Sequence, residues 1–337
     1  MVNMEILLII LVILALVFDF LNGVHDSSNV VATMISSRAI PPRIALMMTA
    51  VSNFLGPFIF GVAVATTIGN DIVSADHINL LVLVAACVSA IIWNVLTWIL
   101  GIPSSSSHAI IGGLVGAVIM AAGYKVIMME GIIKVLIALF ASPIIGFIAG
   151  MLIANIVYLS SWNASPKING VFKKMQIITS IGLSLSHGTN DAQKTMGIIT
   201  LGLVIAGVQS TFEVPLWVIV ACASAIGLGT AVGGWQLIKT LGSKFYKIRP
   251  VHGFASQATS AIVILTASLL GGPVSTTQVV SSSIMGVGAA ERMSKVRWGV
   301  AGEIVTAWII TIPATMAAGA GCYWLFDKAM PLIMNLF

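Results

Sequence analysis

The sequence predicts an all-α polytopic membrane protein with about 10–12 transmembrane helices arranged as two inverted-topology repeats. Three observations lead to this fold class. The chain of 337 residues is 58% hydrophobic and only 8% charged, whereas soluble domains carry about 25% charged residues. Its mean hydropathy is +1.06. Two sets of polar motifs also recur about half a chain apart, which indicates two related halves.

Ten apolar segments are candidates for membrane spans. They lie at 5–36, 44–68, 78–100, 104–121, 135–157, 176–209, 216–238, 255–270, 275–290 and 298–326. The first and sixth exceed the ~20 residues that one helix needs to cross a bilayer, and each contains a polar glycine-aspartate motif. We therefore expect both to be helices broken in mid-membrane at the motif. The short segments beside Gly-Pro, at 104–121, 255–270 and 275–290, are candidate re-entrant hairpins.

The motifs define the two repeats. Gly23 and Asp26 recur as Gly188 and Asp191, an offset of 165 residues, and a Gly-x-Pro motif followed by hydroxyl residues recurs at an offset of 170. The nearly equal offsets predict a duplicated chain. We expect the first repeat at 1–157, a cytoplasmic linker at 158–175 and the second repeat at 176–337.

The charge of the connecting loops predicts that the halves are inverted. The connection after the first motif is basic, and the one after the second carries Glu213. The next connection holds Asp71 and Asp76 in the first half, whereas its counterpart at 239–249 is basic. Since cytoplasmic loops are enriched in Lys and Arg, corresponding loops lie on opposite sides of the membrane.

This alternation gives an orientation. We expect a multi-pass protein of the cell inner (plasma) membrane with both termini outside. The loops at 36–43, 158–175, 239–249 and 290–297 are expected inside. The 122–134 connection, with Lys125 and Lys134, does not fit this assignment.

Asp26 and Asp191 are the strongest candidates for function. A charged side chain at the centre of a membrane helix costs about 2.5–3.5 kcal/mol, and these two recur in register. Carboxylate and amide oxygens are hard ligands that suit a small cation, and an aspartate can also take up a proton. The candidate cation or proton-coupling residues are Asn22, Asp26, Asn29, Asn190 and Asp191. Asp26 and Asp191 would be the metal ligands if the cation is Na⁺, and no other cofactor is expected.

Two further residues of the motifs are candidate modulators. His25 can carry a proton or be an ordinary buried histidine. Lys194 stands at the position that matches Asn29, and it can neutralise Asp191 or attract an anion. Asp19 and Glu303 also lie at membrane depth and receive no role.

The Gly-x-Pro motifs predict an anion site. Proline favours the first turn of a helix, and Ser and Thr are capping residues. Helix N-termini offer free N–H groups and a positive dipole end, which bind phosphate or sulfate. The candidate oxyanion ligands are Ser105, Ser106, Ser107, Ser275, Thr276, Thr277 and Gln278.

Other classes of protein are disfavoured. Serines at 104–107 precede His108, but the chain has no Gly-x-Ser-x-Gly elbow, and Gln278 replaces the histidine in the second copy. Metalloprotease and Walker-type motifs are absent as well. We therefore do not expect an enzyme. The net charge of +5 is attributed to basic loops at one membrane face rather than to nucleic-acid binding. An anion channel is a weaker alternative. Paired carboxylates together with helix caps that can bind an anion indicate coupled binding of a cation and an anion rather than a channel.

These residues resemble the inorganic phosphate transporter (PiT) family, in particular its bacterial low-affinity permeases. The similarity covers nearly the whole chain and lies in motifs at 22–29, 103–108, 186–194, 249–254 and 273–278. The resemblance implies symport of inorganic phosphate with Na⁺ or H⁺, or of a metal–phosphate complex, by alternating access, and a homodimer. His25 and Lys194 replace residues that are often Asn in the family, which leaves the coupling ion open. A sulfate permease of the same fold is the alternative.

Overall fold

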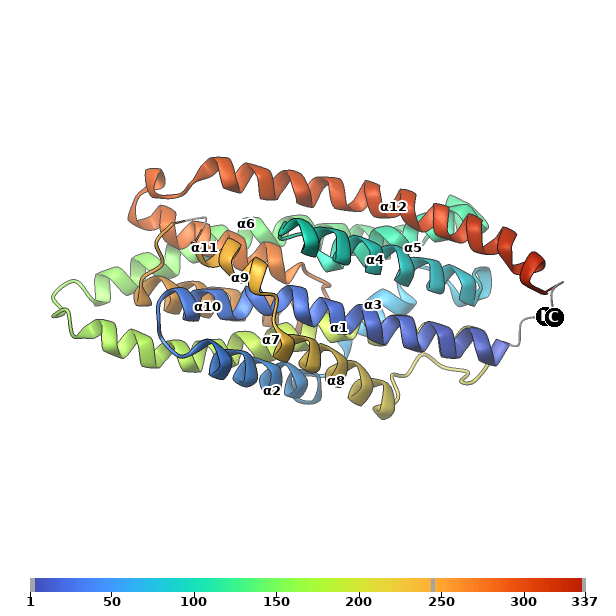
Figure 1. Cartoon of the computed structure of the whole chain (residues 1–337), viewed down its shortest axis with the longest axis horizontal. Coiled ribbons are helices and arrows are strands. Elements are labelled where there is room, and N and C mark those ends of the chain that lie inside the picture. Colours follow the sequence, from blue (N-terminus) through green and yellow to red (C-terminus); the bar gives the residue numbers. More distant parts are fainter. Residues whose placement is uncertain (1–3, 244–245, 335–337) are drawn as a thin grey trace.

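The structure is a computed structural model that describes residues 4–243 and 246–334. Within this part of the chain all regular elements are helices, most of them aligned along one long axis (Figure 1). Residues 4–160 form α1 (Met4–Ser36), α2 (Pro42–Phe60), α3 (Ala63–Asn70), α4 (Leu80–Leu100), α5 (Ser106–Ala122) and α6 (Met129–Ser160). Residues 168–334 form α7 (Ile168–Ile205), α8 (Leu216–Val232), α9 (Trp235–Ser243), α10 (Pro250–Leu269), α11 (Thr276–Glu291) and α12 (Trp298–Met334). Short 3-10 helices lie at Ala75–His77 (η1), Tyr124–Val126 (η2) and Met293–Lys295 (η3).

The chain is an integral membrane protein. Five described helices, α1, α2, α4, α6 and α12, are each long and apolar enough to cross a bilayer. α7 is also long enough, at 38 residues, but it carries the second polar motif on a buried stretch. The outer surface of the bundle is covered with large exposed apolar side chains such as Ile137, Ile144 and Ile309, as expected where helices face lipid.

The prediction that the first and sixth spans are broken at their motifs is wrong. α1 and α7 run through the motifs without interruption. The motif glycines instead allow neighbouring helices to approach closely. A Cβ atom at Gly23 would lie 3.0 Å from the Thr230 backbone nitrogen on α8, and one at Gly188 would meet the Asn53 backbone on α2. Small residues have this role at many membrane helix contacts.

The breaks lie in the next spans of each half. The span predicted at 44–68 divides into α2 and α3 at Gly61, which has φ +80°. The span predicted at 216–238 divides into α8 and α9 at Gly233, which has φ +78°. Both positive φ values favour glycine.

Side chains from the two motifs satisfy the backbone groups that these breaks release. Gln193 Oε1 accepts from the Val64 and Ala65 N–H groups at the start of α3, at 2.7 and 3.2 Å, while its amide nitrogen donates to the Gly61 carbonyl at 2.5 Å. In the other half, the Ser27 hydroxyl accepts from the Gly234 N–H at 2.8 Å. Irregular backbone is tolerated at membrane depth only with such partners.

Two helical hairpins turn inside the bundle. α4 and α5 occupy one half of its length and α10 and α11 occupy the other half (Figure 1). Their turns begin at Gly101 (φ +66°) and Gly271 (φ +71°) and end at the caps Ser105 and Ser275. The candidate re-entrant segments are therefore the second arm of the first hairpin and both arms of the second.

The order of elements in the first half recurs in the second: a long helix, a broken pair, a hairpin and a second long helix. In Figure 1, α1 and α6 run from right to left, whereas α7 and α12 run from left to right. The α1–α2, α6–α7 and α11–α12 connections all lie at the left end, and α1 starts at the right end. The predicted linker corresponds to the short connection at 161–167 together with the adjoining ends of α6 and α7.

Lys134, which did not fit the loop assignment, lies on α6 rather than in a loop. Its ammonium group lies 3.7 Å from the carboxylate of Asp71 and donates to the Thr67 hydroxyl at 3.0 Å. This basic residue is thus paired with the acidic connection at the same end of the bundle.

Candidate functional site

The two motifs and the two Ser/Thr caps meet at one place inside the bundle. Asp26 on α1 is fully buried, and it accepts hydrogen bonds from hydroxyls of both hairpins. The Ser106 hydroxyl on α5 donates to it at 3.2 Å, and the Thr277 hydroxyl on α11 donates at 2.9 Å. A single carboxylate of the first half therefore joins helix starts from both halves.

Asp191 on α7 has a matching position and a different set of partners. The Thr276 hydroxyl donates to it at 2.8 Å, and Lys194, one turn further along α7, forms an ion pair with it. His187 Nε2 lies 3.0 Å from Asp191 Oδ2, although not in hydrogen-bonding geometry. These three partners come from one motif and one cap.

Lys194 links the second motif to the hairpin turns. Its side chain is buried, with 1% exposed. Besides the ion pair, its ammonium group donates to the Ser107 hydroxyl at 2.6 Å and to the Val274 carbonyl at 3.1 Å. Ser107 in turn donates to the Val274 carbonyl at 3.0 Å. All three donors of the ammonium group are thus used, and the tips of the two hairpins are held together.

The acidic residues come close enough to share a cation. One ligand atom each from Asp26, His187 and Asp191 lie within 4.8 Å of one another, and all three residues are buried. His25 adds a second imidazole, whose Nδ1 lies 3.0 Å from Asp26 Oδ1. Carboxylates suit a hard cation and imidazoles can hold a proton, so the chemistry of this cluster fits either coupling ion.

The predicted asparagines are all buried but have different surroundings. Asn29 donates to the Thr277 hydroxyl at 3.0 Å, so it supports the first cap. Asn190 donates to the Ser268 hydroxyl at 2.8 Å and to the Gly272 carbonyl at 3.3 Å, so it holds the second hairpin. Neither polar atom of Asn22 has a hydrogen-bond partner within the described residues.

The predicted oxyanion ligands divide into helix caps and residues whose hydroxyls bond to other elements. The side chains of Ser105 and Ser275 accept from the N–H groups three residues later, at 3.1 and 3.4 Å, and so cap α5 and α11. The next two residues of each helix direct their hydroxyls at the carboxylates and at the hairpin turn. These four are Ser106, Ser107, Thr276 and Thr277.

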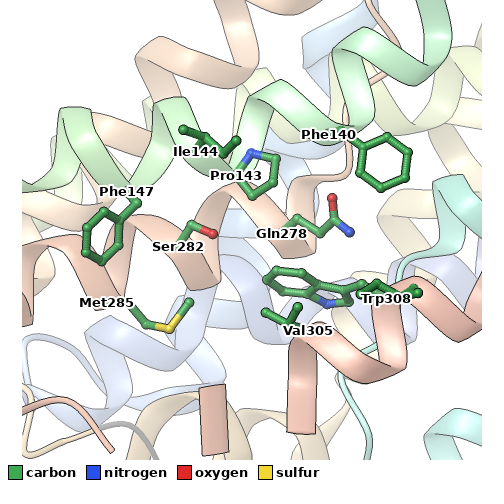
Figure 2. A pocket seen from close by; sticks show the side chains of 10 residues that line it. Phe140, Pro143, Ile144, Phe147, Gln278, Ser282, Met285, Val305 and Trp308 are labelled. Atoms are coloured by element: carbon green, nitrogen blue, oxygen red, sulfur yellow. The ribbon is translucent and has the colours of Figure 1, made fainter. Parts of the chain in front are cut away.

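Gln278 is the exception among the predicted ligands. Its side chain lies in a groove of about 390 Å³ between α6, α11 and α12. Figure 2 shows its amide among apolar side chains, with Phe140 and Trp308 on either side. No described residue donates a hydrogen bond to this amide oxygen. The structure therefore does not bring the Gln278 side chain to the hydroxyl cluster.

Three residues of the motifs have contacts that the sequence reasoning missed. His187 lies four residues before Asp191 and thus on the same helical face, a spacing that could have drawn attention to it. Gln193 and Ser27 cap the breaks in neighbouring helices. Nothing in the local sequence indicates those contacts, because they join elements more than one hundred residues apart.

Comparison with known proteins identifies relatives over nearly the whole chain. The model of the phosphate transporter family matches residues 22–165 and 158–319. A probable low-affinity inorganic phosphate transporter of Bacillus subtilis is 47% identical over 96% of this chain and 98% of its own length. One from Rhizobium meliloti is 45% identical over 95% and 97%, respectively.

A solved structure described as the sodium-dependent phosphate transporter has the same fold, with a TM-score of 0.89 and 26% identity. The alignment covers 96% of this chain and 99% of that one. The relatives found are transporters or permeases rather than enzymes. The chain belongs to the phosphate transporter family.

Proposed function

We propose that this protein is a secondary active symporter that moves inorganic phosphate across the cell membrane together with a monovalent cation, H⁺ or Na⁺. The observation that carries the proposal is the meeting of Asp26 and Asp191 with the Ser/Thr starts of α5 and α11. A cation site and an anion site thus share the same side chains. Because the two sites share side chains, binding of the cation changes binding of the anion, which is what coupled transport requires.

The charges of the site explain why a cation is needed. The two carboxylates and Lys194 together carry one net negative charge. An anion entering this low-dielectric region would be repelled. A proton or Na⁺ bound at Asp26 and Asp191 removes that repulsion, and it releases the hydroxyls that now donate to the carboxylates.

The anion would then bind at the two helix starts. The hydroxyls of Ser106, Ser107, Thr276 and Thr277 and the unbonded N–H groups of the first turns of α5 and α11 are its donors. Lys194, which already contacts Ser107, adds a positive charge there. Asn22, Asn29, Asn190 and His25 would assist the cation, and Gln278 stays a sequence prediction.

Phosphate fits this site better than sulfate. Phosphate near neutral pH still carries a proton and can donate a hydrogen bond to a carboxylate, whereas sulfate has no proton to donate. Asp26 and Asp191 accept hydrogen bonds directly from the hydroxyl donors. The site therefore offers hydrogen-bond acceptors as well as donors. A site built only of donors would favour sulfate.

Movement would follow from the repeated architecture. We propose that the halves are inverted repeats, because α1 and α7, and likewise α6 and α12, run in opposite directions (Figure 1). Rocking of one half against the other around the shared site would expose it to each side in turn. The basic connections at one end of the bundle support a cytoplasmic location for that end, with both termini outside. A homodimer is proposed from the family resemblance alone.

Uptake of labelled phosphate into proteoliposomes tests this proposal. The purified protein should concentrate phosphate when an inward Na⁺ or pH gradient is imposed, with each gradient varied independently. Asp26→Asn and Asp191→Asn should abolish concentrative uptake, whereas Asp76→Asn, which alters an exposed acid in a connection, should not. Normal gradient-driven uptake by both site variants would refute the role of these carboxylates. Conductance without accumulation would indicate a channel, and competition by sulfate would report on selectivity.

A further inference from the structure

A groove on the outer surface of the bundle lies between α6 and α10, away from the carboxylates of the candidate site. Its volume is about 390 Å³. Its lining includes Ile137, Ile145 and Leu270, which are all exposed large apolar side chains. Because such a surface faces lipid in a membrane protein, the groove opens towards the hydrocarbon of the bilayer, and its occupant must be largely apolar.

The length of the groove matches one acyl chain. On α6 the lining begins at Lys134 and ends at Ile145. Eleven residues at 1.5 Å each give a length of about 16 Å. This is close to half of the ~30 Å hydrocarbon core, which is the depth that the chains of one leaflet fill. The small side chains of Ala138 and Ala141 line the groove between these two residues, so the wall leaves room for a chain.

Two opposite charges lie at the Lys134 end of the groove. The ammonium group of Lys134 lies 3.7 Å from the carboxylate of Asp71, and the two side chains are 46% and 37% exposed. This separation is longer than a hydrogen bond. The ammonium group uses one of its three donors on the Thr67 hydroxyl. Both charged groups can therefore bind a further partner at the lipid-facing surface.

The pair of charges selects the head group of the lipid. A purely anionic head group would bind Lys134 but would be repelled by Asp71. A phosphate next to a primary ammonium group satisfies both, because the phosphate accepts from Lys134 and the ammonium group donates to Asp71. A quaternary ammonium group has no N–H to donate. The chemistry that fits both the groove and the charges is that of an aminophospholipid such as phosphatidylethanolamine.

We propose that the groove between α6 and α10 binds one aminophospholipid, with its head group on Lys134 and Asp71 and one acyl chain along the groove. This inference depends neither on the coupling ion nor on the symport proposed above, because it concerns a surface outside the candidate site.

The bound chain would also contact the turn of the second hairpin. Gly272 and Val274 line the groove. The Gly272 carbonyl accepts from Asn190, and the Val274 carbonyl accepts from Lys194 and Ser107. The lipid would thus pack against one side of a turn whose carbonyls hold residues of the candidate site. We expect the lipid to stabilise this turn and, through it, the folded protein.

Lipid counting by native mass spectrometry tests the inference. The purified full-length protein is titrated with phosphatidylethanolamine, phosphatidylcholine or phosphatidylglycerol of identical acyl chains. We expect one phosphatidylethanolamine to bind most tightly. Lys134→Gln should weaken that binding by about tenfold, because a hydrogen bond to a charged group is lost. Lys125→Gln, which alters an exposed lysine of the preceding connection outside the groove, should bind like the wild type.

Two further variants separate the chain from the head group. Ala141→Phe fills the groove without touching the charges, and it should lower the affinity for all three lipids. Ile148→Phe, on the exposed side of the same helix, is its control and should have no effect. Asp71→Asn should abolish the preference for phosphatidylethanolamine over phosphatidylglycerol, because it removes both the acceptor for the ammonium group and the repulsion of the anion.

Melting temperatures in detergent, measured with and without each lipid, complete the test. Phosphatidylethanolamine should raise the melting temperature of the wild type more than that of Lys134→Gln or Ala141→Phe. Unchanged lipid binding in both of these variants would overturn the inference. Equal binding of all three lipids by the wild type would contradict the assigned head group. A change of oligomeric state in Ala141→Phe without a change in lipid binding would assign the groove to a second copy of the chain and also overturn it.

Discussion

The two motifs of this protein occupy matching positions, and they differ mainly by one charge. Asp26 on α1 is followed three residues later by Asn29, whereas Asp191 on α7 is followed by Lys194. As a result Asp191 has an ion pair with a lysine, whereas the hydrogen-bonding partners of Asp26 among the described residues are hydroxyls and His25. Under the proposed symport, the first half is therefore the side that still needs a cation. The second half has a fixed positive charge, Lys194, which under the same proposal helps to hold the anion.

The strongest way to break this comparison is to remove the fixed charge. Lys194→Asn gives the second motif the residue of the first, and it leaves Asp191 buried without its partner. Removing one partner of a buried ion pair costs about 3–5 kcal/mol, so we expect a large fall in melting temperature and loss of phosphate uptake. Asn29→Ala, at the matching position, should cost much less, because it removes only one neutral hydrogen bond to Thr277.

A double variant sharpens the result. Asp191→Asn combined with Lys194→Asn removes both charges and should recover much of the lost stability, although not the uptake. Equal destabilisation by Lys194→Asn and Asn29→Ala would show that the asymmetry between the motifs has no energetic meaning.

The capping residues of the two motifs should also differ in effect. Gln193 satisfies two N–H groups and one carbonyl at the α2–α3 break, whereas Ser27 satisfies one N–H group at the α8–α9 break. Leaving a buried group without a partner costs about 1–3 kcal/mol. Gln193→Ala should therefore lower the unfolding free energy more than Ser27→Ala, as measured by thermal unfolding in detergent. The reverse order would indicate that these breaks are stabilised by other contacts.

A lysine in the first motif tests the same asymmetry from the other side. Asn29→Lys puts a tethered charge near Asp26, as Lys194 lies near Asp191. The tethered charge should compete with the bound cation for Asp26, so the ion concentration needed for half-maximal uptake should rise by about tenfold, which corresponds to 1.4 kcal/mol. Asn29→Met, of similar length without charge, is the control for crowding. The same change in both variants would point to steric disturbance.

The smallest expected effect concerns the end of α11. There the second half has a charged residue, Glu291, in a cluster of ion pairs, whereas the matching residue of the first half is the uncharged Ala121. Burial alone would raise the pKa of Glu291, but ion pairs with Lys295 and Arg249 lower it to about 2. Because the folded-state pKa lies below the ordinary value of 4.5, the stabilisation is complete above about pH 4.5 and is lost as the pH falls towards 2. Glu291→Gln should flatten that part of the pH–stability curve; an unchanged curve would mean that the ion pairs contribute nothing.

The sequence predicted those parts of the fold that depend on local chemistry. Gly-x-Pro followed by Ser and Thr predicted helix starts, and α5 and α11 begin with Ser105 and Ser275 as their caps. The register of Asp26 and Asp191 predicted that the two motifs meet, and their ligand atoms do lie close together.

The continuity of α1 and α7 could not be predicted from the sequence. A Gly-Asp motif in a long apolar span is compatible with a broken helix and with a whole one. The outcome depends on whether other helices supply partners for the polar groups. Here the hairpins provide hydroxyls for Asp26, and α8 packs directly against Gly23. The breaks at Gly61 and Gly233 depend on distant side chains, Gln193 and Ser27, in the same way.

The central claim is that one cluster of side chains binds both the cation and the phosphate. Equilibrium binding of labelled phosphate to the purified protein, at a series of Na⁺ concentrations and pH values, tests it most directly. We expect the coupling ion to tighten phosphate binding in the wild type, and Asp26→Asn or Asp191→Asn to remove that dependence. Phosphate binding that tightens with the ion equally in the wild type and in both variants would contradict the account.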